Sequence, residues 1–160
     1  MKKRFLNPEL IGPSLALAII IVLVSLTTPR FMLVENIRNI FLQVSIVSLI
    51  AIGSTLVILS GGIDLSPGSM IALLTMVLTS LVKLKGMNIF AAIFLILAVS
   101  ALLGLINGTL SAYLRIPAFI ATLATQGIFR GGAFMINEGS PIYSISDSLQ
   151  KFFYGSVFGI

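Results

Sequence analysis

The chain has 160 residues, of which 58% are hydrophobic and only 9% are charged. Soluble domains carry about 25% charged residues, so this composition excludes an ordinary soluble domain and is typical of an integral membrane protein. The formal charge of +5 does not indicate nucleic-acid binding, because the basic residues beyond an N-terminal cluster are scattered and form no stripe. Cysteine and histidine are absent, which excludes thiolate metal sites, disulfides and the commonest general base.

The first predicted element is a membrane helix near residues 11–28. It follows the basic cluster Lys2, Lys3 and Arg4, and Pro29 comes directly after it. A signal peptide would require a small-residue cleavage site after a short apolar region, which is missing here. We therefore predict an uncleaved first span, with the N-terminus held in the cytoplasm by the basic cluster.

Further membrane helices are predicted in the long uncharged stretches between charged residues. These stretches place helices near residues 40–60, 67–83 and 89–113. A fifth helix, near 117–136, contains Arg130 followed by Gly131 and Gly132. It is either a full span with Arg130 facing protein or water, or a shorter broken helix; we favour an irregular fifth span.

The remaining residues, 137–160, mix charges, aromatic residues, serine and glycine. They are interpreted as an extramembrane tail with a short amphipathic helix near 146–154, and the apolar end as a cut. The chain is thus predicted to be one all-α transmembrane domain over 1–160. With the N-terminus inside, Lys83 and Lys85 lie outside and Arg115 inside, so the positive-inside rule is supported at the N-terminus but not at the Lys83–Lys85 loop.

A polar break at residues 61–69 separates two apolar runs. Its Asp64 is the only acidic residue between Glu35 and Glu138. Gly61 and Gly62 are expected to end the second helix, and Ser66 followed by Pro67 fits an N-cap and first helical position. Asp64 either caps this helix start or lines a polar pathway or moving joint. Caps are far commoner, so the capping role is favoured, and the two roles are compatible.

The fourth helix carries a ridge of small residues, formed by Gly104, Gly108 and Ala112. Such a ridge lets two membrane helices approach closely, so its predicted role is packing. Asn107 lies beside it and is expected to bond a neighbouring helix, with a pathway role as the alternative.

The fifth helix carries a polar stripe. Thr122, Gln126 and Arg130 recur every four residues and share one face, with Thr125 beside them. A stripe ending in arginine is costly against lipid, so it should face other helices or a cavity. Arg130 is alternatively an interfacial anchor, paired with Glu138.

No motif for covalent chemistry is present: the chain lacks a phosphate-binding GxxxxGK[ST] loop, HExxH, GxSxG and paired carboxylates. We therefore predict no catalytic residue, no metal and no cofactor, and conclude that the chain is not an enzyme.

Several segments resemble one family, the ribose-type permease subunits of bacterial ATP-binding-cassette sugar importers. The most specific is the block Gly61-Gly62-Ile63-Asp64-Leu65-Ser66-Pro67-Gly68-Ser69. Weaker matches, in the same order as in the family, are Thr28-Pro29-Arg30-Phe31, Asn36-Ile37, Thr55-Leu56-Val57-Ile58-Leu59, Ile106-Asn107-Gly108, Pro117-Ala118-Phe119-Ile120-Ala121-Thr122-Leu123, Arg130-Gly131 and Gly139-Ser140-Pro141-Ile142. The chain departs from the family at Pro67, where valine is more frequent, and at Ala118, where a second proline is common.

The resemblance implies half of a roughly ten-helix permease in the bacterial inner membrane, forming the translocation path for a ribose-like monosaccharide. It implies a second permease copy, a cytoplasmic ATPase that hydrolyses ATP, and a periplasmic or lipid-anchored sugar-binding protein. The helix that couples to the ATPase would lie beyond residue 160. Three alternatives stay open: a permease for branched-chain amino acids, an ion-coupled secondary transporter with Asp64 as its carboxylate, and a structural or assembly subunit.

Overall fold

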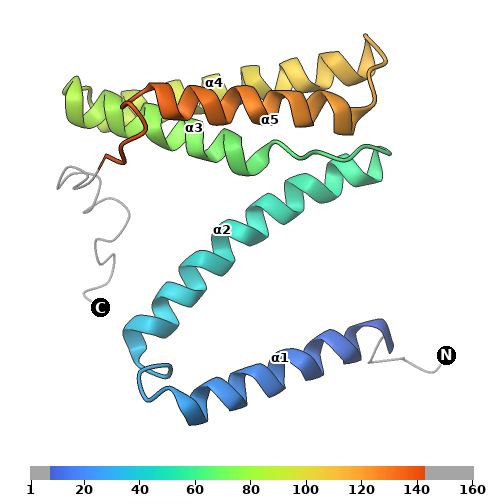
Figure 1. Cartoon of the computed structure of the whole chain (residues 1–160), viewed down its shortest axis with the longest axis vertical. Coiled ribbons are helices and arrows are strands. Elements are labelled where there is room, and N and C mark those ends of the chain that lie inside the picture. The colour runs from blue at the N-terminus through green and yellow to red at the C-terminus, as the bar shows by residue number, and fades with distance from the viewer. Residues whose placement is uncertain (1–7, 143–160) are drawn as a thin grey trace. The chain divides into compact units, whose positions relative to one another are not determined.

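The computed structural model describes residues 8–142, and all regular structure in that range is helical (Figure 1). This confirms the predicted all-α class. The helices are α1 (Pro8–Thr27), α2 (Val34–Leu59), α3 (Pro67–Thr79), α4 (Ile89–Ala112) and α5 (Ala118–Met135), and a π-helical turn, η1 (Ser80–Leu84), continues α3. The chain forms two compact units, Met1–Ala51 and Ile52–Ile160.

Four helical segments within the described range are long and apolar enough to cross a membrane: α1, α2, α3 together with η1, and α4. The chain is therefore a multi-pass membrane protein. The fifth helix is not among these four, because threonine, glutamine and arginine side chains dilute its apolar character. The prediction that α5 is irregular is wrong: it is one uninterrupted α-helix that runs through Gly131 and Gly132.

The second helix begins earlier than the predicted residue 40, at Val34. Glu35 lies in its first turn, where the positive end of the helix dipole stabilises a carboxylate. Charged residues near a helix start therefore do not mark its boundary. The preceding turn is fixed by Asn36, whose Nδ2 donates to the carbonyl of Phe31 at 2.7 Å. The amphipathic helix predicted near 146–154, and most of the predicted tail, lie outside the described residues.

The second unit is built around three helices. In Figure 1, α5 lies alongside α3, and α4 packs against both. The buried side chains of α5 fall on one face and are mostly small or hydroxylated: Ala121, Thr122, Thr125, Phe129 and Ala133. Large apolar side chains of the same helix, such as Leu123 and Ile128, are exposed. This pattern, with small and polar residues inside and large apolar residues outside, suits a helix bundle in lipid.

A tight reversal between η1 and α4 sets the antiparallel course of α4. Val82 and Ala92 are buried against each other there. Asn88 caps α4, because its side chain accepts hydrogen bonds from the backbone N–H groups of Phe90 and Ala91 at 2.9 and 3.4 Å. The reversal brings the later turns of α4 back to the start of α3, and so places Asn107 beside Ser66.

Candidate functional site

The break between α2 and α3 starts with a glycine that ends α2. Gly61 has φ +86°, a left-handed conformation that residues with a side chain rarely adopt. Its N–H donates to Ile58 O at 2.9 Å, and the N–H of Gly62 donates to Val57 O at 3.0 Å. These two bonds form a Schellman motif, which satisfies carbonyls left over at the helix end. The backbone then runs without helix until Pro67.

Asp64 organises the start of α3 through one carboxylate oxygen. Its Oδ1 accepts hydrogen bonds from the backbone N–H of Ser66 at 2.8 Å and from the Ser66 hydroxyl at 2.7 Å. Ser66 occupies the N-cap position and Pro67 begins the helix, but the Ser66 side chain makes no capping bond. The predicted N-cap position of Ser66 and first helical position of Pro67 are therefore confirmed. The hydroxyl is turned back to Asp64, because a carboxylate is the stronger acceptor.

Asn107 of α4 joins this cluster from the neighbouring helix. Ser66 is completely buried, and its hydroxyl accepts a hydrogen bond from Asn107 Nδ2 at 3.0 Å. The direction of each bond follows from Asp64, which, as a carboxylate, can only accept. Ser66 must therefore donate to Asp64 and accept from Asn107. This leaves Asn107 Oδ1 buried and without a hydrogen-bond partner.

Thr122 ties the same loop to α5. The backbone N–H of Leu65 donates to Thr122 Oγ1 at 3.1 Å. The Thr122 hydroxyl donates its proton to a backbone carbonyl. The two acceptors within reach are Ala118 O at 2.8 Å and Ile63 O at 3.2 Å. The buried side chain of Thr122 thus links α5 to the break at 61–69 by a hydrogen bond. We refer to Asp64, Ser66, Asn107 and Thr122 as the polar cluster.

A cavity of about 680 Å³ lies beside the polar cluster. Gly61, Gly62, Asp64, Asn107 and Thr122 line it, as do all three residues of the small-residue ridge, Gly104, Gly108 and Ala112. The structure therefore brings together residues that the sequence analysis treated as separate features. Ser60, Ser111 and Arg115 line the cavity as well, although none of the three was predicted as a site residue.

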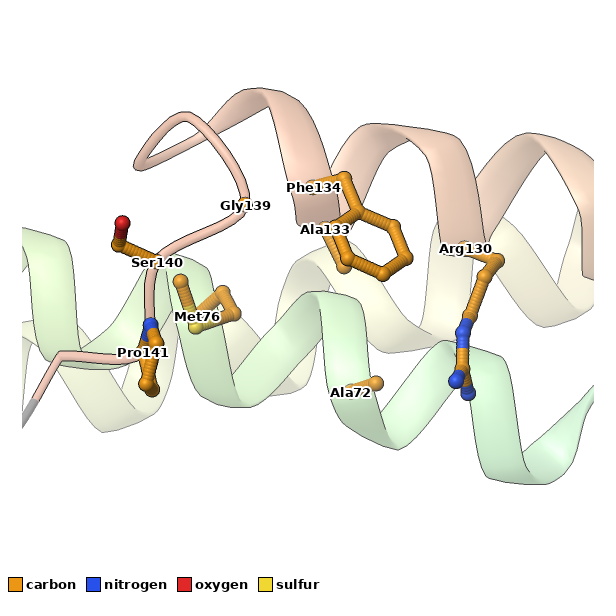
Figure 2. Close-up of a pocket in the computed structure, with 8 residues that line it drawn as sticks. All are labelled: Ala72, Met76, Arg130, Ala133, Phe134, Gly139, Ser140 and Pro141. Carbon is orange, nitrogen blue, oxygen red and sulfur yellow. The ribbon is translucent and has the colours of Figure 1, made fainter.

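Arg130 and Gln126 lie outside that cavity. Arg130 is exposed, and its guanidinium lies 5.9 Å from the ring centre of Phe134, one turn further along α5. Figure 2 shows the arginine extending from α5 toward α3, beside a smaller hollow of about 270 Å³ that Met76, Ala133 and Pro141 also line. Within residues 8–142 no ion pair joins Arg130 to Glu138. Gln126 is half-buried. The predicted stripe is thus buried at Thr122 and reaches the surface at Arg130.

Two further hydroxyls are buried next to the polar cluster: Thr125, predicted beside the stripe, and Ser69, to which the sequence analysis gave no separate role. Ser69 Oγ donates to Ser66 O at 2.9 Å, and Thr125 Oγ1 donates to Thr122 O at 3.2 Å. Ser69 lies one turn after Ser66, as Thr125 lies one turn after Thr122, so helical spacing was the signal that could have identified Ser69. Both hydroxyls reinforce the backbone next to the polar cluster.

Comparison with known proteins identifies the family. Residues 36–157 match the family described as the permease component of the branched-chain amino acid transport system. The chain is 42% identical over 139 residues to the ribose import permease protein of Haemophilus influenzae, covering 86% of this chain and 43% of that protein. It is 40% identical over 152 residues to the ribose import permease protein of Bacillus subtilis, covering 94% and 47%.

A third relative, the D-allose transport system permease protein of Escherichia coli, is 39% identical over 151 residues, or 93% of this chain and 46% of that protein. The chain thus spans about half the length of the curated relatives it matches. No solved structure matches it. The family match covers most of the chain, and the relatives confirm the resemblance read from the GGIDLSPGS block. The chain belongs to this permease family, and the three relatives described above are named for ribose or allose.

Proposed function

We propose that this chain forms part of the translocation path of an ATP-binding-cassette importer for a monosaccharide. The observation that carries the proposal is its similarity, at about 40% identity over most of the chain, to permeases named for ribose and allose. The matched region includes the polar break at 61–69, which suits a path because irregular backbone at membrane depth is tolerated only where it is packed in protein or lines a cavity. Here it does both.

The proposed partners are those that a permease of an ATP-binding-cassette importer requires. An importer permease works with a cytoplasmic ATPase, on which ATP hydrolysis takes place, and with a binding protein that delivers the sugar outside the membrane. A second permease copy in the inner membrane completes the path, and the N-terminus lies in the cytoplasm. Because the binding protein selects the sugar, the path has no need of a tight site.

The polar cluster serves this function as a joint. Asp64, Asn107 and Thr122 connect the break to α4 and α5, while Gly61, Gly62, Ser66 and Pro67 shape the break itself. A motion of α4 or α5 is therefore transmitted to the backbone beside the cavity. Gln126 and Arg130 would contact the path, or parts of the importer, further along α5.

The alternatives are less well supported. The family description mentions branched-chain amino acids, but the three relatives described above are named for sugars. An ion-coupled transporter would use Asp64 as its carrier, yet one oxygen of that carboxylate already accepts two hydrogen bonds from Ser66. A purely structural subunit would have no use for a cavity that Asp64, Asn107 and Thr122 help to line.

The substrate class is tested by complementation. A bacterial strain that lacks its ribose permease receives the full-length gene for this permease together with the cognate ATPase and binding protein. We expect uptake of radiolabelled ribose or allose, with no competition by excess leucine. Leucine uptake without sugar uptake would overturn the proposal in favour of the amino-acid alternative.

A further inference from the structure

The cavity beside the polar cluster is lined by two residues of opposite charge, Asp64 and Arg115. Asp64 comes from the break and Arg115 from the turn between α4 and α5, and every residue that lines the cavity belongs to the second unit. No ion pair joins the two side chains in the described part of the chain. Each charge therefore needs water or a ligand as its partner.

Asp64 keeps one carboxylate oxygen for such a partner. Both hydrogen bonds that the carboxylate accepts from described residues go to Oδ1. The second oxygen, Oδ2, is also accessible, because Asn107 Oδ1 is the one fully buried side-chain oxygen or nitrogen that lacks a partner among residues 8–142. Because a carboxylate oxygen has two lone pairs, Oδ2 can accept hydrogen bonds from a ligand in the cavity.

Arg115 occupies a backbone position that favours glycine. Its φ is +56°, in the left-handed region, and the turn is closed by the N–H of Ile116, which donates to Leu110 O at 3.1 Å. Glycine would adopt this conformation without steric cost. The side chain is exposed, so packing within the described residues does not explain the arginine. An unfavourable conformation at the edge of a cavity indicates that the side chain has a function there.

The charges of the lining favour a polar occupant over a lipid chain or an apolar helix. An apolar occupant would leave Asp64 and Arg115 charged and without partners, which is costly in a membrane. A suitable ligand donates to the carboxylate and accepts from the guanidinium, and a hydroxyl group does both. A sugar carries several hydroxyls and can bond both residues at once. The cavity volume of about 680 Å³ lies in the range of small-molecule sites, about 300–1,000 Å³.

We propose that this cavity is a low-affinity binding site for the transported monosaccharide, and that Arg115 is one of the residues that contact it. Sugar hydroxyls donate to Asp64 Oδ2 and accept from the Arg115 guanidinium. The inference rests on the proposed function for the identity of the ligand. Asp64→Asn leaves the site usable, because the amide NH₂ group donates to a hydroxyl oxygen where Oδ2 accepted from one.

Arg115→Gly separates a role in transport from a role in folding. In the complete importer, reconstituted in liposomes, we expect it to lower ATP-dependent uptake of ribose or allose about tenfold, because the charged donor is lost. The variant should be at least as stable as the wild type in detergent, because glycine relieves the left-handed backbone. Arg115→Lys keeps a charged donor and should retain about half of the uptake.

Glu138→Gly is the matched control. Glu138 is the other non-glycine residue with left-handed backbone in the described range, at φ +51°, and it does not line the cavity. We expect the same effect on stability as for Arg115→Gly, with wild-type uptake. Wild-type uptake by Arg115→Gly would overturn the proposal, and so would an equal loss of uptake in Glu138→Gly.

Occupancy of the cavity is measured with a single thiol. These 160 residues contain no cysteine, so any other cysteines of the full-length permease are replaced by serine. Ser111→Cys then places the thiol in the cavity lining, and Ser140→Cys, exposed and outside this cavity, is the control. Labelling by a water-soluble thiol reagent is followed by mass spectrometry of the permease. Ribose or allose should slow labelling at position 111 about threefold once it occupies about two thirds of the sites, and should not slow it at position 140.

Three results of the labelling experiment would overturn the proposal: no labelling of Ser111→Cys, labelling that neither sugar slows, and labelling that leucine slows while the sugars do not. Sugar uptake by the wild-type importer is measured in parallel. Sugar uptake without protection of position 111 refutes the cavity site alone, whereas an importer that takes up neither ribose nor allose refutes the proposed function.

Discussion

At the scale of single residues, the hydrogen bonds that Asp64 accepts explain why a carboxylate lies between two apolar helices. Asp64 accepts two bonds from Ser66 through one oxygen, and Ser66 in turn accepts from Asn107. Charge-assisted bonds of this kind are about twice as strong as neutral ones, which offsets part of the cost of removing the carboxylate from water. These bonds hold the backbone at the start of α3, and the joint role of Asp64 stays a proposal.

Thr122 offers a clean test of the polar cluster. Thr122→Val keeps the shape of the side chain but leaves the Leu65 N–H without its acceptor, which costs about 1–3 kcal/mol. We expect this substitution to lower the apparent melting temperature of the protein in mild detergent by several degrees. Thr122→Ser, which keeps the hydroxyl, should lower it much less.

Thr75→Val is the matched control, because the Thr75 hydroxyl is exposed and donates only to Ile71 O within its own helix. Its effect should stay within about 0.5 kcal/mol. Equal destabilisation by Thr122→Val and Thr75→Val would show that the bond from α5 to the break contributes nothing.

At the scale of elements, α2 ends at Gly61, which adopts a left-handed backbone conformation that residues with a side chain rarely adopt. Gly61 is in open space, so a methyl group there meets no neighbour and only the backbone opposes it. Gly61→Ala should therefore destabilise the protein by about 1–2 kcal/mol. Gly53, in the middle of α2, is equally free of neighbours but helical, so Gly53→Ala should be neutral or stabilise by up to about 1 kcal/mol.

Thermal unfolding in detergent, followed by size-exclusion chromatography, measures both glycine variants. Opposite signs are expected for the two. A Gly61→Ala protein as stable as Gly53→Ala would mean that α2 does not need its left-handed end.

The elements that sequence reasoning predicted are those governed by local rules. Uncharged stretches located α1, α3 and α4, and the glycine pair located the end of α2, because lipid excludes charge and left-handed backbone favours glycine. The start of α2 was missed because Glu35 is compatible with a first helical turn. The regularity of α5 was missed because Gly131 and Gly132 carry helical backbone at little cost when one face is packed: a Cβ on Gly132 would lie 3.3 Å from Leu73.

The geometry of the site could be predicted only in part. Asp64, Asn107 and Thr122 were each identified, but their assembly depends on how α4 and α5 fold back onto α3, which no local pattern encodes. The Ser66 hydroxyl donates to Asp64, two residues before it, but its second bond, from Asn107, depends on the fold and could not be predicted from local spacing. Arg130 shares a helical face with Thr122 but reaches a different surface, because α3 covers only part of that face.

At the scale of the whole molecule, the second unit is a bundle in which α3, α4 and α5 pack against one another. Large apolar side chains such as Leu102 and Ile128 are exposed, whereas Ser66, Asn107 and Thr122 are buried inside. This pattern suits a bundle in lipid, and the chain spans about half the length of the curated relatives it matches. Transport is accordingly proposed for the complete importer, and not for these 160 residues alone.

The central claim, that Asp64 belongs to a joint in an ATP-driven sugar path and carries no proton, is tested most directly by reconstitution. The full-length permease, its ATPase and its binding protein are placed in liposomes, and ATP-dependent uptake of radiolabelled ribose is measured for the wild type and for Asp64→Asn. Asparagine retains the oxygen that Ser66 needs, so we predict uptake within about threefold of the wild type, insensitive to a protonophore. Complete loss of uptake in Asp64→Asn at normal membrane levels, with wild-type uptake driven by a proton gradient without ATP, would contradict the account.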